Sequence, residues 1–236
     1  MINLSPPRAL SRLFTGITWY VAQSPRTIYL TFDDGPVEGV TDWVLDLLAS
    51  YNARATFFCL GRNAERYPEL LNRIRREGHV VGNHTYSHLR GFSVPTIEYY
   101  QDVIMANDIL HSALFRPPYA RFTPKQYNAL KQHFKVVFWS VLSMDYSKWI
   151  SPVRCSEMVL ANVKGGDIVV FHDSHKAEEN LRYALPICLE YLTDLGYRFL
   201  PLEERLCAPI LSEVIDTETI LNPELLRVKN KQELKY

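Results

Sequence analysis

The sequence predicts an α/β fold, a distorted (β/α)7-type barrel in which parallel strands lie inside and helices outside. Between residues 27 and 200, short apolar runs alternate with longer amphipathic stretches, which is the pattern of successive βα units. About seven such units follow one another without a clear linker, and this number favours a closed barrel over an open sheet. The chain has 236 residues, a length that a single α/β barrel commonly takes.

The predicted strands are short runs rich in β-branched and aromatic residues, and turn signals or polar side chains follow them. The first contains Ile28, Tyr29 and Leu30, and a turn follows at Gly35 and Pro36. In chain order, the predicted strands span residues 27–31, 55–60, 79–82, 114–116, 135–140, 168–171 and 198–200.

The predicted helices carry apolar residues at helical spacing, as Val40, Val44 and Leu48 do in the first of them. Glycines close two of these helices, at Gly78 and at Gly165. In chain order, the predicted helices span residues 40–50, 64–77, 96–112, 123–132, 154–163 and 178–195.

The alternating pattern divides the chain into three parts. Residues 1–26 form an N-terminal extension, residues 27–208 form the α/β domain, and residues 209–236 form a polar C-terminal tail. The tail has one weakly helical stretch at residues 221–228. We find no sequence repeat and no low-complexity segment.

Composition limits the classes of partner. Lys plus Arg and Asp plus Glu both number 26, so nothing favours a nucleic-acid or anionic-membrane partner, and a neutral substrate fits more easily than a polyanionic one. The sequence contains no apolar run of membrane-spanning length and no signal-peptide pattern at its start. We therefore expect a cytoplasmic protein, or an exported one whose leader has been removed.

Four widely spaced cysteines are expected to be free buried thiols: Cys59, Cys155, Cys188 and Cys207.

Titratable or ligand-capable side chains follow five of the predicted strands. In α/β folds the carboxyl ends of parallel strands lie at one edge, where active sites are built. This placement predicts a single polar site at that edge. The side chains are Asp33 and Asp34, His84 and His88, Arg116 and Tyr119, Asp145, and His172 and Asp173.

Two adjacent carboxylates, Asp33 and Asp34, suggest a metal ligand beside a base, because they repel each other unless a cation or different protonation separates them. A solvated Asp-Gly-Pro turn is the alternative. His84 and His88 would meet on one face of a helical turn and hold one ion. Two imidazoles and one carboxylate make an open site for Zn²⁺ or a similar ion. The histidines in predicted strands and helices are interpreted as structural: His79, His111 and His133.

His172 is either a core histidine with its hydrogen bonds made inside the protein or a proton donor. The second interpretation is possible because imidazole titrates near neutrality. Asp145 would hold its ring protonated and oriented. Arg116 would lie beside Asp33 and stabilise the charged carboxylate. The alternative for Arg116 is a surface ion pair worth under about 1 kcal/mol.

These motifs, in this order and at these intervals, resemble those of the polysaccharide deacetylases, the carbohydrate esterase family 4 or NodB-homology enzymes. The resemblance extends over residues 27–200 and is highly specific as a combination. It implies a distorted (β/α) barrel and metal-dependent removal of acetyl groups from N-acetylated sugars. The motifs are Thr31-Phe32-Asp33-Asp34-Gly35-Pro36, His84-Thr85-Tyr86-Ser87-His88, Arg116-Pro117-Pro118-Tyr119, Asp145 and Phe171-His172-Asp173.

The resemblance implies a role for each matching residue. Asp33 would be the general base. Asp34, His84 and His88 would hold a divalent metal, with Zn²⁺ favoured and Co²⁺ as the alternative. The supporting residues would be Tyr119, whose backbone N–H faces the oxyanion, Arg116 beside Asp33, and Asp145 beside the general acid His172.

The chain departs from the family's pattern around the acetyl group. Leu142 stands where the fourth motif usually has its first Asp, and Tyr146 replaces a Trp. Val170 replaces the Leu of the fifth motif, and Ala120 replaces a common Gly. Tyr146 and Val170 would help form the acetyl-methyl pocket, so these departures bear on substrate preference and remove no primary catalytic group.

The predicted substrate is an N-acetylated sugar polymer or oligomer, chitooligosaccharide or the N-acetylglucosamine of peptidoglycan, with release of acetate. The alternatives are an O-acetyl esterase acting on acetylxylan-like substrates and a catalytically inactive carbohydrate-binding relative. The oligomeric state is left open. The predicted substrate-binding residues are Tyr119, Tyr146, Val170 and Trp149. The three aromatic rings among them would stack on sugars or pack in the core and loops.

Overall fold

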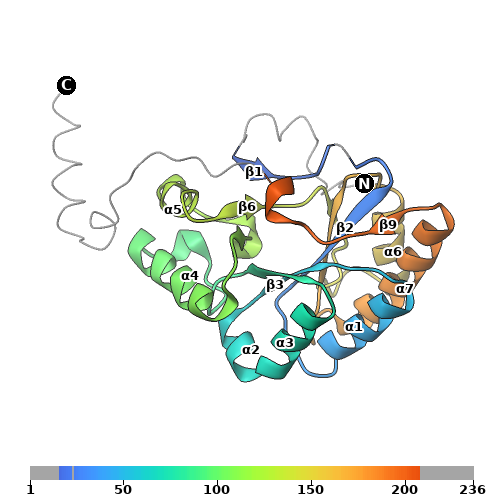
Figure 1. Cartoon of the computed structure of the whole chain (residues 1–236), viewed down its shortest axis with the longest axis horizontal. Coiled ribbons are helices and arrows are strands. Elements are labelled where there is room, and N and C mark those ends of the chain that lie inside the picture. Colours follow the sequence, from blue (N-terminus) through green and yellow to red (C-terminus); the bar gives the residue numbers. More distant parts are fainter. Residues whose placement is uncertain (1–15, 23, 208–236) are drawn as a thin grey trace, which may run out of the picture.

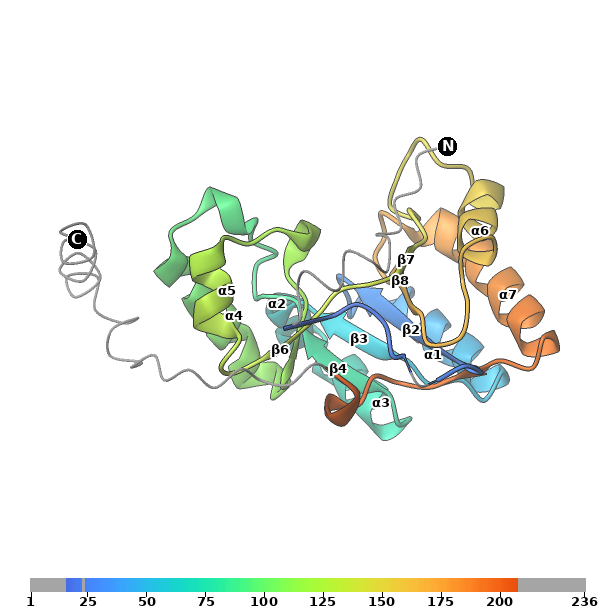
Figure 2. The same ribbon diagram turned by 90° about the horizontal axis from the view of Figure 1, so that it is seen from above.

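The computed structural model describes residues 16–22 and 24–207, and within them one sheet curls into a distorted barrel (Figure 1). The sheet order is β1-β6-β5-β4-β3-β2-β8-β7, with β9 beside β2. Every strand pair is parallel. Helices lie on the outside of this sheet (Figures 1 and 2). The predicted barrel class is confirmed.

The strands are short and the helices longer, as the sequence pattern predicts. The strands are β1 Ile17–Thr18, β2 Thr27–Asp33, β3 Thr56–Cys59, β4 Val80–Asn83, β5 Leu114–Phe115, β6 Lys135–Val137, β7 Val141–Leu142, β8 Ile168–His172 and β9 Arg198–Phe199. The helices are α1 Thr41–Ser50, α2 Gly61–Arg66, α3 Pro68–Arg76, α4 Thr96–Leu110, α5 Pro124–Leu130, α6 Pro152–Leu160 and α7 Glu178–Asp194. Short 3₁₀ turns cover Gly91–Ser93, Pro118–Ala120 and Glu204–Leu206.

One predicted helix, residues 64–77, is in fact two. Helix α2 ends at Arg66, and α3 begins at Pro68. Proline lacks a backbone N–H and disfavours helical geometry at the residue before it, so Tyr67 leaves the helical region with φ −126° and ψ 60°.

The predicted strand at residues 135–140 contains only β6, and β7 begins directly after it at Val141. The two strands lie near opposite ends of the sheet. Strand β6 pairs with β5 and β1, whereas β7 pairs with β8. Between them the Phe138 N–H donates to the Thr18 carbonyl, and the Ser140 N–H donates to the Ile168 carbonyl. This run therefore crosses between the two ends of the sheet and closes the barrel.

Strand β1 belongs to the sheet although it lies inside the predicted N-terminal extension, residues 1–26. The predicted tail, residues 209–236, with its helical stretch at residues 221–228, falls outside the described residues. Among the described helices, none combines the length and the apolar character that crossing a membrane requires.

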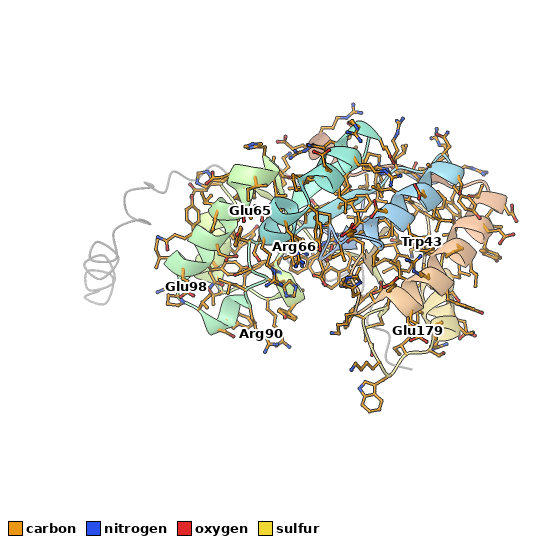
Figure 3. All side chains as sticks on the ribbon, turned by 90° about the horizontal axis from the view of Figure 1, so that it is seen from below. Trp43, Glu65, Arg66, Arg90, Glu98 and Glu179 are labelled. Carbon is orange, nitrogen blue, oxygen red and sulfur yellow. The ribbon has the colours of Figure 1, made fainter. Side chains whose placement is uncertain are left out.

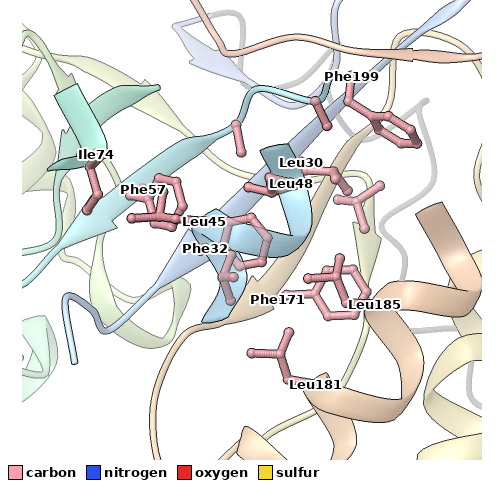
Figure 4. Packing of buried hydrophobic residues seen from close by; sticks show 14 of the residues in the cluster. Leu30, Phe32, Leu45, Leu48, Phe57, Ile74, Phe171, Leu181, Leu185 and Phe199 are labelled. Atoms are coloured by element: carbon pink, nitrogen blue, oxygen red, sulfur yellow. The ribbon is translucent and has the colours of Figure 1, made fainter. Parts of the chain in front are cut away.

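The buried apolar residues form three clusters around the sheet. Outward-facing side chains such as Leu30, Phe32 and Phe57 pack against α1 and α7 (Figure 4). The next residues along β2, Tyr29 and Thr31, point to the other face, because side chains alternate along a strand. By the same alternation Asp33 lies on the inner face, at the carboxyl end of β2. The four cysteines are buried and free, as predicted.

Candidate active site

A cavity of about 520 Å³ opens at the carboxyl ends of the strands. Side chains from β2, β7 and β8 and from the segments that follow β2, β4, β5, β6, β7 and β8 line it. Its lining residues are Asp33, Asp34, His84, His88, Arg90, Pro117, Tyr119, Arg121, Trp139, Leu142, Tyr146, Val170, His172 and Lys176. Most of the site residues expected from the sequence are therefore brought together at one place.

Asp33 lies on the cavity floor, where Arg116 holds it. The Arg116 guanidinium is fully buried and donates to Asp33 Oδ1 over 2.6 Å. The same nitrogen also donates to the hydroxyl of Thr31. Burial lowers the pKa of Arg116, and the Asp33 carboxylate beside it opposes that effect. The predicted Arg116–Asp33 contact is present, and it is a buried pair rather than a surface one.

Asp34, His84 and His88 form a compact set of ligand atoms. Asp34 Oδ1 lies 3.6 Å from His84 Nε2 and 3.2 Å from His88 Nε2. One ligand atom from each of the three lies within 4.8 Å of the others. The Nδ1–H of His84 donates to the Arg116 carbonyl over 2.7 Å, which leaves Nε2 as the lone-pair nitrogen.

This set fits a divalent cation. In the described part of the chain, the buried Oδ1 of Asp34 accepts no well-formed hydrogen bond, although buried polar atoms normally have partners. Burial raises the pKa of Asp34, but the His88, His172 and His84 imidazoles outweigh it and hold the pKa well below its usual range. Burial lowers the pKa of His84 to about 4, so its ring is neutral at pH 7, as a metal ligand must be.

The two histidines meet through a loop and not through a helical turn, which corrects the sequence-based expectation. Residues 84–88 are irregular, with positive φ at Thr85 (68°) and His88 (63°). The Thr85 N–H donates to the Asn83 side chain, and the Thr85 hydroxyl accepts from the His88 N–H. Asp102 of α4 accepts from the backbone N–H groups of Tyr86 and Ser87. Turn geometry set by side chains therefore replaces the i, i+4 spacing of a helix.

The turn after β2 holds the two carboxylates in different orientations. Asp34 adopts φ 80° and contacts the two histidines, whereas Asp33 contacts Arg116. Buried Asp173 accepts from the Gly35 N–H and from the Thr41 hydroxyl. A Cβ on Gly35 would lie 2.0 Å from the Asp173 carboxylate, so only glycine fits there. Asp173 is thus a support of the turn.

His172 and Asp145 form a second polar pair in the cavity. The Nδ1–H of His172 donates to Asp145 Oδ1 over 2.7 Å, and its backbone N–H donates to Oδ2 over 2.7 Å. Burial lowers the pKa of His172, but Asp145 outweighs it and raises the pKa to about 9. The ring is therefore protonated at pH 7, and no residue in the described part of the chain accepts from its Nε2–H.

Aromatic and apolar groups shape the rest of the cavity. Tyr119 has φ 59°, and its backbone N–H donates to no group within residues 16–22 and 24–207. Tyr146 packs edge-on against His172 at 4.8 Å between ring centroids. Val170 and Leu142 line the cavity as apolar groups.

One predicted substrate-binding residue stays apart from this group. Trp149 is 95% exposed and is not among the lining residues. His79 is structural as interpreted, because its Nδ1 accepts from the Ala55 N–H.

Sequence reasoning missed four residues at the site: Arg90, Arg121, Trp139 and Lys176 line the cavity. Each lies within a few positions of a predicted site residue or of Leu142, and that proximity is the only signal that the sequence offers for it.

Comparison with known proteins places these features in a family. The sequence profile described as Polysaccharide deacetylase matches residues 20–136. A peptidoglycan-N-acetylglucosamine deacetylase of Bacillus cereus is 35% identical over 80% of this chain and 92% of its own length. The chain belongs to the polysaccharide deacetylase family. A chitooligosaccharide deacetylase of Azorhizobium caulinodans is 33% identical over 67% of this chain and 79% of that relative.

A solved structure of a deacetylase has the same fold as this chain and supports its assignment to the family. The Bc1960 peptidoglycan N-acetylglucosamine deacetylase, in complex with a hydroxamate-type benzamide, superposes with a TM-score of 0.75 at 33% identity, covering 81% of this chain and 93% of that one. Some relatives are longer: the chain spans 56% of a second Bacillus cereus deacetylase and 39% of a Listeria monocytogenes one. The predicted family and the predicted class of enzyme, a deacetylase, are confirmed by these relatives.

Proposed function

We propose that this deacetylase-family chain hydrolyses the N-acetyl groups of an N-acetylated sugar polymer or oligomer, peptidoglycan N-acetylglucosamine or chitooligosaccharide, and releases acetate. One observation carries the proposal. A single cavity holds a ligand set open to solvent, a carboxylate held by a buried arginine, and a protonated histidine held by a carboxylate. These groups fit metal-assisted amide hydrolysis by a general base and a general acid.

Asp33 is the general base in this proposal. It lies on the cavity floor, and its contact with Arg116 fixes the direction of its carboxylate. It accepts a proton from the water that attacks the acetamide carbonyl. A divalent ion held by Asp34, His84 and His88 would supply a Lewis acid that activates this water and polarises the acyl oxygen.

His172 is the general acid. Its Nδ1–H is engaged with Asp145, so Nε2–H is the proton that faces the cavity. It donates this proton to the sugar nitrogen as the carbon–nitrogen bond breaks. The Tyr119 backbone N–H donates to the oxyanion of the tetrahedral intermediate, a contact of the kind commonly worth about 3–4 kcal/mol.

The acetyl methyl group would lie against Tyr146, Val170 and Leu142. Tyr146 and Val170 both line the cavity beside His172, and each differs from the residue usual in the family. Zn²⁺ is the favoured ion because two imidazoles and one carboxylate suit it, and Co²⁺ accepts the same donors. A peptidoglycan substrate would require the enzyme to act outside the cytoplasmic membrane.

The test is a screen for acetate release with metal-free, Zn²⁺-loaded and Co²⁺-loaded protein. The substrates are chitooligosaccharides, peptidoglycan glycan strands and acetylxylan. We expect acetate from one or both N-acetylated substrates and none after chelation. Acetate from acetylxylan alone would replace the proposal by an O-acetyl esterase, and no turnover on any substrate with metal bound would indicate a non-catalytic relative.

A further inference from the structure

Three cationic side chains lie at the mouth of the active-site cavity: Arg90, Arg121 and Lys176. All three are exposed. They come from the loops that follow β4, β5 and β8. The two acids among the lining residues, Asp33 and Asp34, lie deeper and face Arg116 and the histidines. The mouth of the cavity is therefore positively charged, although the net charge of the whole chain is zero.

Two of these cations are held over aromatic rings on the two sides of Asp33. On one side, Arg90 lies 4.9 Å from the ring of Tyr119, whose centroid is 4.7 Å from that of His88. On the other, Lys176 lies 5.3 Å from the ring of Tyr146. Cation–π contacts of this kind orient a side chain while leaving its N–H groups available to a ligand.

The sheet order explains why the two stacks face each other across the site. Strands β4 and β5 lie on one side of β2, and β8 and β7 lie on the other. Figure 3 shows Arg90 on the side of the molecule that holds α2 and α4, and Glu179, at the start of α7, on the other side. A sugar chain bound across Asp33 would pass between the two cations.

No carboxylate pairs with any of the three cations in the described part of the chain. Other exposed arginines do have such partners: Arg73 contacts Asp46 and Glu77, and Arg182 contacts Glu178. The cations at the mouth are thus left available at the place where a substrate enters.

We propose that Arg90, Arg121 and Lys176 bind carboxylate groups on the sugars that flank the reacting one, and so select an anionic glycan over a neutral one. This inference rests on the proposed deacetylase function. The chemistry fits a strand that alternates N-acetylglucosamine with N-acetylmuramic acid, because each muramic acid carries a lactyl carboxylate. A neutral chitooligosaccharide offers these three side chains no anion. The selectivity is an electrostatic one, and salt weakens it.

The test compares two forms of the same substrate. Soluble peptidoglycan strands without stem peptides keep their lactyl carboxylates, and amidation with a neutral amine removes those charges at constant chain length. A third sample with stem peptides shows whether peptide carboxylates add to the effect. The measured quantity is the ratio of kcat/KM for the charged strand to that for the amidated strand, at low and high KCl.

The variant protein is the triple Arg90→Gln, Arg121→Gln and Lys176→Gln. Its matched control is the triple Arg26→Gln, Arg54→Gln and Arg198→Gln, which removes the same charge from exposed arginines at the amino ends of the strands. Exposed pairs change affinity by about 1.4–5-fold each, so we expect the substrate ratio to fall about tenfold in the first triple and not in the control.

Two results would overturn the inference: equal kcat/KM of the wild-type enzyme on both strands, or a preference that survives the first triple. Failure of the proposed function has a different signature, which is no acetate from any strand or from chitooligosaccharide. In that case, equilibrium binding of the charged and amidated strands still tests whether the three cations select the charged strand. A salt-sensitive preference that only the first triple loses would support it, and equal binding would refute it.

Discussion

Asp33 and Asp34 are adjacent and carry the same side chain, yet they face different partners. Asp33 contacts Arg116, and Asp34 contacts His84 and His88. The backbone of Asp34 is left-handed, with φ 80°. Each can therefore be changed without removing the partners of the other.

Replacing Asp33 with Asn should abolish catalysis and leave the metal bound. The amide keeps the shape of the carboxylate but cannot take a proton, and a general base is commonly worth about 10²–10⁴-fold in rate. Asp34→Ala should instead lower the metal content. Acetate release and elemental analysis measure the two effects, with Asp108→Asn on the exposed face of α4 as the control. Retained activity in Asp33→Asn would contradict the assignment.

Asp145→Asn should change the pH dependence of the reaction. Asp145 raises the pKa of His172 to about 9, so the acid form is present below that pH and is lost as the pH rises through it. Without the carboxylate, the alkaline limb of the kcat profile should move to lower pH by about one unit or more. Asp108→Asn serves again as the control, and an unmoved limb in Asp145→Asn would rule out the proposed pairing.

At the scale of elements, loops and strand ends carry the chemistry while helices fix their position. Helix α4 shows this, since Asp102 accepts from the loop after β4 and the Val103 carbonyl accepts from Asn83 at the end of that strand. At the other end of β4, the ring of His79 accepts from the Ala55 N–H and so links that strand to the start of β3.

His79 should make stability depend on pH. Burial lowers its pKa to about 4 from 6.5, so the folded state keeps the ring neutral while the unfolded chain takes up a proton below about 6.5. The free energy of unfolding should fall by about 1–2 kcal/mol between pH 7 and pH 5 on this account. His79→Gln should lose less over that range than the wild type and the exposed control His133→Gln, as measured by urea unfolding. Identical pH dependence in all three proteins would refute it.

At the scale of the molecule, one buried side chain links the parts of the barrel. Arg116 follows β5 and donates to Asp33 and Thr31 of β2, to the Val137 carbonyl of β6 and to the Phe138 carbonyl. Arg116 thereby joins β2, at the centre of the sheet, to residues 135–142, which close the barrel.

Arg116→Met should destabilise the fold by about 3–5 kcal/mol, because it leaves the buried Asp33 carboxylate without its partner. The double variant with Asp33→Asn should recover part of this loss, since the neutral amide needs no cation. Urea unfolding of the two single variants and the double gives the coupling energy. If the losses in unfolding free energy of the two single variants add up to that of the double variant, the Arg116–Asp33 pair is not the cause of the destabilisation. If Arg116→Met does not fold, Arg116→Lys keeps the charge and should give an intermediate loss.

The amino-acid sequence by itself determined the barrel class, the family and most of the side chains that meet in the cavity. Alternation of apolar runs and the order of motifs are properties of the chain that require no coordinates. Asp33 and His172 are the last residues of β2 and β8, and Asp34, His84 and His88 lie just after β2 and β4. Only the tertiary structure decided that residues 135–142 close the barrel, because the partners of β6 and β7 lie far away in the chain. It also decided that a loop and not a helix joins the two histidines, and that Arg90 and Lys176 stand over Tyr119 and Tyr146. Contacts between distant segments depend on how strands are ordered in the sheet, and no local pattern records that order.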